Sequence, residues 1–211
     1  MATPSRGLLT WHAEGNNIPD SPYFSRVAHH PSQSSGVTIG RGYDMKERSR
    51  DEIVGHLTAA GVPLDEVAIL ADGARLRGAG AAGFIARREV REIVITEAAE
   101  LALFEAIYPF YLREAERLCT KADVTEVYGE CRWESFLPLL QEVIADLRFR
   151  GDYSPASRRL IQNAIVSGDL AAIRDAIDSI PGVPADRRRR RHEVMNQAIA
   201  IQERTRVPAL Q

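Results

Sequence analysis

Beyond residue 95, apolar residues recur every three or four positions, which is the spacing of one face of an α-helix. Several of these segments begin at residues that favour helix N-termini, namely Thr96, Asp169 and the pair Ser154–Pro155. The second half of the chain is therefore predicted to be almost entirely helical. Helices are expected at residues 96–118, 133–151, 170–180 and 185–204, with a further one starting at Ser154–Pro155.

The first part of the chain has a different pattern. Residues 7–14 show helical spacing, whereas residues 15–35 are dense in Asn, Pro, Ser and His, which is typical of a loop. Residues 36–44, GVTIGRGYD, combine strand formers with glycine and predict one short strand. Two short helices are expected next, the first opened by the capping box Ser49–Glu52 and the second at residues 63–72.

These elements predict an α+β fold that is predominantly α-helical. The glycine-rich segment 73–83 resembles a flexible connection between two lobes. We expect a small β-containing lobe at about residues 1–72, a hinge at about 73–95 and a larger helical lobe at about 96–211. A cleft between two lobes is a common place for a binding site.

Composition sets limits but does not specify a function. The 211 residues are 45% apolar and 27% charged, as in ordinary globular proteins, and the net charge of −2 marks no nucleic-acid or membrane binder. No apolar run approaches the ~20 residues that cross a bilayer. Residues 1–10 lack the apolar region of an export signal, so we expect synthesis in the cytoplasm. Cys119 and Cys131 allow free thiols or one bridge, and we expect free thiols.

Glu14 is the first candidate for chemistry. It ends the first predicted helix, just before Gly15, with apolar Trp11 and Ala13 nearby. Partial burial would favour the protonated carboxyl group that a general acid needs. The alternative is a solvated glutamate at a helix end.

Thr38 and Asp44 form the second candidate. In an extended strand they share one face, with only Gly40 and Gly42 between them. Such a face is open, so a bulky ligand could lie close to the backbone while the hydroxyl and the carboxylate hold a water molecule. The alternative is a hairpin whose glycines make turns and whose Asp44 caps the next segment.

A glutamate and a glycine at a helix end, then a loop and a T-I-G-x-G strand, resemble the T4-lysozyme-like muramidases. These enzymes cut the β-1,4 bond between N-acetylmuramic acid and N-acetylglucosamine in peptidoglycan. Phage members have the spacing E-x8-D-x5-T, but here the sixth position before Thr38 is Ser32. Asp44 instead follows Thr38 by six residues, which looks like the pesticin branch, the lysozyme domains of bacteriocins and type VI secretion effectors. Weaker similarity covers about residues 7–203.

The resemblance implies a single lysozyme-like catalytic domain over residues 1–211. It implies Glu14 as general acid and Asp44 with Thr38 as the groups that activate water, with inversion at the anomeric carbon. It implies no cofactor and no metal. The implied protein is a monomer that acts on the bacterial cell wall in the periplasm after delivery. It would be an antibacterial effector, a bacteriocin domain or an endolysin, with a possible immunity protein as partner.

Other residues allow more than one interpretation. Tyr23, Arg41 and Tyr43 could line the sugar cleft or could be structural. Five consecutive arginines, residues 187–191, cover every face of a helix, so at least one is expected to turn inward. The others could form a solvated face, or one could meet Glu14 or the anionic stem peptides of the wall. Two rival functions remain: a lytic transglycosylase, or a non-catalytic helical module that binds nucleic acid through the arginine run.

Overall fold

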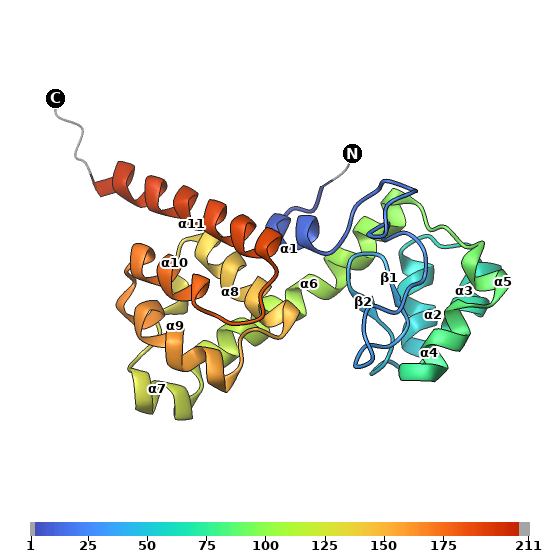
Figure 1. The fold of residues 1–211 in the computed structure, drawn as a ribbon, viewed down its shortest axis with the longest axis horizontal. Coiled ribbons are helices and arrows are strands. Elements are labelled where there is room, and N and C mark those ends of the chain that lie inside the picture. The colour runs from blue at the N-terminus through green and yellow to red at the C-terminus, as the bar shows by residue number, and fades with distance from the viewer. Residues whose placement is uncertain (1–2, 207–211) are drawn as a thin grey trace. The chain divides into compact units, whose positions relative to one another are not determined.

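The computed structural model describes residues 3–206. Within that range the protein is mainly helical and has one two-stranded antiparallel sheet (Figure 1), which confirms the α+β, predominantly helical fold class. The strands are β1 (Thr38–Ile39) and β2 (Tyr43–Asp44). The helices are α1 (Leu8–Ala13), α2 (Arg50–Ala59), α3 (Leu64–Ala71), α4 (Gly78–Ile85), α5 (Arg88–Arg91), α6 (Glu97–Thr120), α7 (Ala122–Tyr128), α8 (Pro138–Arg150), α9 (Pro155–Ser167), α10 (Leu170–Asp178) and α11 (Ala185–Arg206), with a 3-10 turn at Trp133–Ser135.

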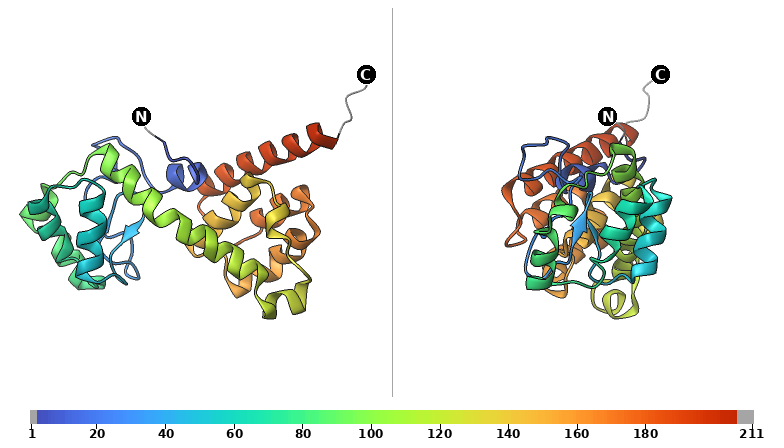
Figure 2. Two further views of the ribbon diagram at one scale, coloured as in Figure 1. Left: turned by 180° about the vertical axis from the view of Figure 1, so that it is seen from behind. Right: turned by 90° about the vertical axis from the view of Figure 1, so that its right-hand side faces the viewer.

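The chain divides into two compact units with the boundary between Tyr108 and Pro109. The boundary falls inside α6, which continues through Pro109 as one helix (Figures 1 and 2). Residues 73–95, expected to be a hinge, therefore belong to the first unit.

Residues 36–44 form a tight hairpin, which is the alternative interpretation of the sequence and not the single strand. β1 and β2 pair antiparallel, with Thr38 directly opposite Asp44. Gly40 and Gly42 have φ angles of 60° and 86°, which residues other than glycine rarely adopt, so the glycines let the chain reverse. Thr38 and Asp44 still share a face, but they do so as cross-strand partners.

The predicted helix starts are confirmed where a side chain caps the helix. Ser49 accepts a hydrogen bond from the backbone of Glu52, and the Glu52 carboxylate accepts one from the backbone of Ser49. Thr96 Oγ1 accepts from Ala99 N at 3.0 Å, and Asp169 caps α10 in the same way. Each of these bonds satisfies a backbone N–H that the first turn of a helix leaves unpaired.

The glycine-rich segment 73–83 is not the flexible connection expected. Its second half belongs to α4, in which Ala81 and Phe84 are buried at 0% and 1% exposure. Glycine costs helix stability relative to alanine, but burial of an aromatic side chain is worth more than that difference. Tertiary packing therefore overrides the local propensity of this segment.

The second unit packs α8, α9, α10 and α11 against one another. Its interior is lined by aliphatic side chains such as Val143, Ile161 and Ile173, each fully buried. Cys119 and Cys131 are free thiols, as expected, and both are buried. Of the helices described in residues 3–206, none has the length and apolar character that crossing a bilayer requires.

Candidate active site

The carboxylate of Asp44 is held by the backbone on either side of the hairpin. Its Oδ1 atom accepts hydrogen bonds from Gly36 N at 3.1 Å and from Lys46 N at 2.9 Å. Its side chain is 26% exposed, and the Lys46 ammonium lies 3.8 Å from Oδ2. Asp44 thus caps the turn after β2, as the alternative interpretation of the sequence held, and it also keeps a solvent-accessible edge.

Gly36 makes this arrangement possible. A Cβ atom at this position would lie 2.7 Å from Asp44 Oδ1, 2.6 Å from Lys46 Cβ and 2.9 Å from Leu76 O. These distances are shorter than real contacts allow, so only glycine lets the backbone N–H approach the carboxylate. The orientation of Asp44 therefore depends on the first glycine of GVTIGRGYD.

Thr38 is fixed by its backbone more than by its side chain. Its N–H donates to His29 O and its carbonyl accepts from His29 N, both at 2.8 Å, on the side of β1 away from β2. The hydroxyl lies 3.5 Å from Gly36 O, which is at the outer limit of a hydrogen bond. Thr38 is 4% exposed, so its hydroxyl is buried, and that one long contact holds it only weakly.

Glu14 is the C-cap residue of α1 and is half-buried. Its backbone N–H donates to Thr10 O at 3.0 Å, so the helix continues up to it. The carbonyls on either side of Glu14 are bound by one guanidinium nitrogen, because Arg41 Nη1 donates to Trp11 O and Gly15 O at 2.5 Å each. Arg41 lies in the turn between β1 and β2, so this contact ties the helix end that carries Glu14 to the hairpin that carries the other two candidates.

A buried carboxylate supports Arg41. Glu100 in α6 is 0% exposed, and its Oε2 lies 3.5 Å from Arg41 Nε. Its Oε1 accepts a 2.6 Å hydrogen bond from Ser25 Oγ. Arg41 also stacks on the Trp11 ring, with its guanidinium carbon 4.0 Å from the ring centroid. Burial lowers the pKa of the Arg41 guanidinium, and the carboxylate of Glu100 opposes that shift.

The three residues expected to line a sugar cleft lie in different environments. Arg41 and Tyr43 are 5% and 1% exposed, so the structure uses both inside the unit and not as a ligand surface. The Tyr43 hydroxyl bonds His56 Nδ1 at 2.8 Å, and burial raises the Tyr43 pKa to about 12. Tyr23 is 73% exposed in the loop after α1 and is the one of the three that can meet a ligand.

Comparison with known families places most of the chain in one of them. Residues 7–192 match the model of a family described as Domain of unknown function (DUF8812). The protein belongs to this family. The matched residues include Glu14, Thr38, Asp44, Arg41 and Glu100. No curated protein matches the chain.

The five arginines of residues 187–191, near the end of the matched region, have partners within the second unit. Arg187 and Arg191 turn inward, as expected of at least one, and bind the fully buried Asp146 at 2.6 Å and 2.7 Å. Arg189 and Arg190 pair with Asp186 on the surface of the same helix. Arg188 donates to the backbone carbonyl of Asp178. Each of the five arginines therefore has a partner within the second unit, and two of them are buried with Asp146.

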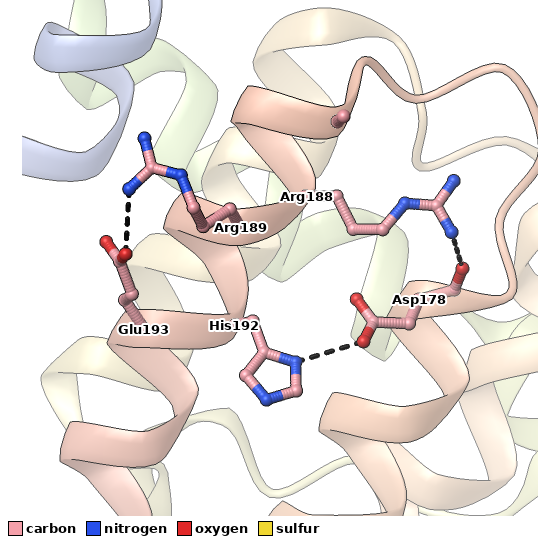
Figure 3. A pocket seen from close by; sticks show the side chains of 6 residues that line it. Asp178, Arg188, Arg189, His192 and Glu193 are labelled. Atoms are coloured by element: carbon pink, nitrogen blue, oxygen red, sulfur yellow. Dashed lines mark hydrogen bonds and ion pairs between the residues drawn. The ribbon is translucent and has the colours of Figure 1, made fainter.

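A shallow pocket of about 270 Å³ lies between α10 and α11 (Figure 3). His192 Nδ1 lies 3.0 Å from Asp178 Oδ2, and Arg189 bonds Glu193 at 2.8 Å, so the charged groups that line the pocket bind each other. Among residues 3–206, no group of three His, Cys, Asp or Glu side chains gathers as a metal site would require.

Sequence reasoning missed Glu100, Ser25 and Gly36 as parts of the site. Glu100 had a usable signal, because it occupies an apolar-stripe position of α6 with Leu103, Phe104 and Ile107, all buried. A carboxylate in such a stripe requires a partner. The identity of that partner depends on tertiary structure and could not be read from spacing.

Proposed function

We propose that this protein is a peptidoglycan hydrolase, a muramidase that cleaves the β-1,4 bond between N-acetylmuramic acid and N-acetylglucosamine. One observation carries the proposal. Thr38 and Asp44 are cross-strand partners on a hairpin whose turn residue, Arg41, binds the helix end bearing Glu14. A carboxyl group is thereby supplied by a helix end, and a carboxylate–hydroxyl pair by the hairpin.

In this proposal Glu14 is the general acid. Its carboxyl proton passes to the glycosidic oxygen as the bond from that oxygen to the anomeric carbon breaks, which leaves a sugar alcohol and an oxocarbenium-like centre. A general acid of this kind contributes about 10²–10⁴-fold to the rate. Glu14 is half-buried at the end of α1, where part of its surface stays accessible to a substrate.

Asp44 and Thr38 act on water in this proposal. Asp44 takes a proton from a water molecule while the oxygen of that water bonds to the anomeric carbon, and the Thr38 hydroxyl orients it. The two backbone N–H groups on Asp44 Oδ1 fix the carboxylate, and its second oxygen serves as the base. A water between the two carboxyl groups gives inversion, which needs a separation of ~6.5–9.5 Å in the substrate complex, whereas ~5–5.5 Å gives retention.

The test uses purified bacterial sacculi and the full chain. Wild-type protein should release soluble fragments whose mass includes one added water, with inverted anomers in NMR spectra recorded during turnover. Glu14→Gln and Asp44→Asn should each lower the rate by roughly 10²-fold or more. The matched controls are Glu47→Gln and Asp72→Asn, because these carboxylates are 70% and 57% exposed and pair with the surface arginines Arg77 and Arg50.

Each alternative gives a distinct result. Anhydro-sugar ends would identify a lytic transglycosylase, which needs one carboxyl group and would tolerate Asp44→Asn. Full activity in Glu14→Gln would refute the assignment of the acid. Absence of any release by wild-type protein from sacculi of several chemotypes would refute the muramidase proposal itself.

A further inference from the structure

We propose that Arg41 is a positioning residue that fixes Glu14 relative to Thr38 and Asp44, with Glu100 as its support; the inference rests on the proposed function. Arg41 is one residue of the hairpin turn, and it was expected to bind substrate. Its burial and its contacts assign it to the enzyme's own framework instead.

The first step of the argument is where the bonds of Arg41 fall. Nη1 binds the carbonyls of Trp11 and Gly15, which lie on either side of Glu14 in the chain. The last carbonyls of a helix have no intrahelical donor, so an arginine that binds them acts as a C-cap supplied by another element. The hairpin therefore determines the direction in which α1 ends. It also determines the Cα position of Glu14.

The second step is that the guanidinium has two further contacts, one with an aromatic ring and one with a buried carboxylate. It lies 4.0 Å from the centroid of the Trp11 ring, and its Nε faces the fully buried Glu100 at 3.5 Å. Ser25 donates to the other Glu100 oxygen, and Ser25 O accepts from Gly40 N at 2.7 Å in the same turn. The hairpin, the loop after α1 and α6 thus all meet at this side chain.

The third step is that lysine cannot replace this arginine. A guanidinium is planar and presents several donors in fixed directions, so it can stack on an indole, face a carboxylate and bind two carbonyls at once. A lysine ammonium has one nitrogen and no flat face. In Arg41→Lys the positive charge stays, but the end of α1 loses part of its attachment.

The experiment measures kcat and KM on sacculi fragments for Arg41→Lys. Displacement of a catalytic group by ~1 Å costs about 10²-fold, so kcat should fall by roughly 10–100-fold while KM stays near the wild-type value. Arg26→Lys is the matched control. Arg26 is also partly buried, donates to the Ile95 carbonyl at 3.2 Å and lies over the Phe24 ring, and it should keep wild-type kcat.

A double variant separates position from stability. Replacing a buried ion pair by apolar side chains is often neutral or stabilising, so Arg41→Met combined with Glu100→Leu should still fold, at a cost in stability for the Ser25 hydroxyl and the two carbonyls that lose a partner. It has no donor for the Trp11 and Gly15 carbonyls, so its kcat should stay low. The proposal would be overturned if the folded double variant kept wild-type kcat. It would also be overturned if kcat fell no further in Arg41→Lys than in Arg26→Lys.

A second readout does not depend on catalysis. Hydrogen exchange should be faster in Arg41→Lys than in wild type at the backbone amides of Glu14 and Asn16, which bond Thr10 O and Tyr23 O. If wild-type protein does not cleave sacculi, the muramidase proposal fails, and the catalytic role of Arg41 fails with it. The exchange result still decides whether Arg41 holds the end of α1, because unchanged exchange would contradict that role.

Discussion

The buried arginine cluster of the second unit gives a stability prediction that can be worked out from the structure. Asp146 is 0% exposed and binds Arg187 and Arg191, whose side chains are 9% and 0% exposed. Asp146→Asn keeps the shape of the side chain but removes its charge, so two buried guanidinium groups lose their shared counter-ion. Breaking a buried pair in this way costs about 3–5 kcal/mol.

The lower end of that range applies here. Arg191 keeps a second carboxylate, because its Nη2 also binds Asp152 at 2.7 Å. We therefore expect a loss of about 3 kcal/mol in the free energy of unfolding. With a urea m-value of about 2 kcal/mol per molar, the midpoint should fall by roughly 1.5 M. Trp133, buried in the same unit, reports the transition by fluorescence in a Trp11→Phe background.

The control is the same substitution at Asp186. This carboxylate also binds two arginines, Arg189 and Arg190, at 2.6 Å and 2.8 Å, but it is 60% exposed. Solvent screens such pairs, so Asp186→Asn should change stability by no more than about 0.5 kcal/mol. The reasoning is refuted if the two variants lose the same amount, because burial is the main difference between the two clusters.

The stabilisation that Asp146 provides with Arg187 and Arg191 should depend on pH in a definite direction. Burial disfavours the charged Asp146 carboxylate, but the attraction and hydrogen bonds of Arg187 and Arg191 outweigh it and hold the Asp146 pKa below its usual value. The stabilisation is therefore complete above the unfolded value of about 4 and is lost as the pH falls through the lower folded pKa. The difference in the free energy of unfolding between wild type and Asp146→Asn should become smaller below about pH 4.

Three further predictions follow from single contacts. Gly36→Ala should destabilise the first unit by about 1–3 kcal/mol, whereas Gly55→Ala, with nothing within 4 Å of the added Cβ, should be neutral or stabilising in thermal unfolding. Burial, with Arg48 nearby, lowers the pKa of His56, so its contribution to stability is complete above about pH 6.5 and falls as His56 protonates. Melting curves from about pH 5 to 8 should show that loss in wild type and less of it in His56→Gln. Cys119 accepts a hydrogen bond from Cys131, which lowers the Cys119 pKa to about 7, but both thiols are buried, so iodoacetamide should label them slowly in the native protein and fast in urea, as mass spectrometry can measure.

Much of the helical architecture could be predicted because its signals are local. Ser49 with Glu52, and likewise Asp169, cap their helices through bonds to residues two or three positions away. The glycines could not be interpreted without the tertiary structure. Those of residues 36–44 allowed either a bare strand face or a turn, and their positive φ angles show the turn. The glycines of α4 were given too much weight, because burial of Phe84 fixes that segment as a helix.

The candidate site could be predicted only in part, because its framework joins residues far apart in the sequence. Glu14, Thr38 and Asp44 were identified by motif, whereas the link between them through Arg41 and Glu100 is tertiary. The two units nevertheless follow one rule. Glu100 and Asp146 are both fully buried carboxylates on helices, and both lie against buried arginines.

An acidic residue inside the apolar stripe of a helix is therefore the signal that sequence analysis can use. Asp146 follows Val143 by three residues in α8, as Leu103 follows Glu100 in α6, and all four side chains are buried. A carboxylate in that position needs a cation to offset its desolvation, so it predicts that an arginine elsewhere in the chain is also buried. For Asp146 in α8, that requirement accounts for the burial of Arg187 and Arg191. For Glu100 in α6, the same requirement accounts for the burial of Arg41, the arginine of TIGRG. The sequence suggests that Arg41 is part of a ligand surface, but its contacts make it part of the framework that holds Glu14.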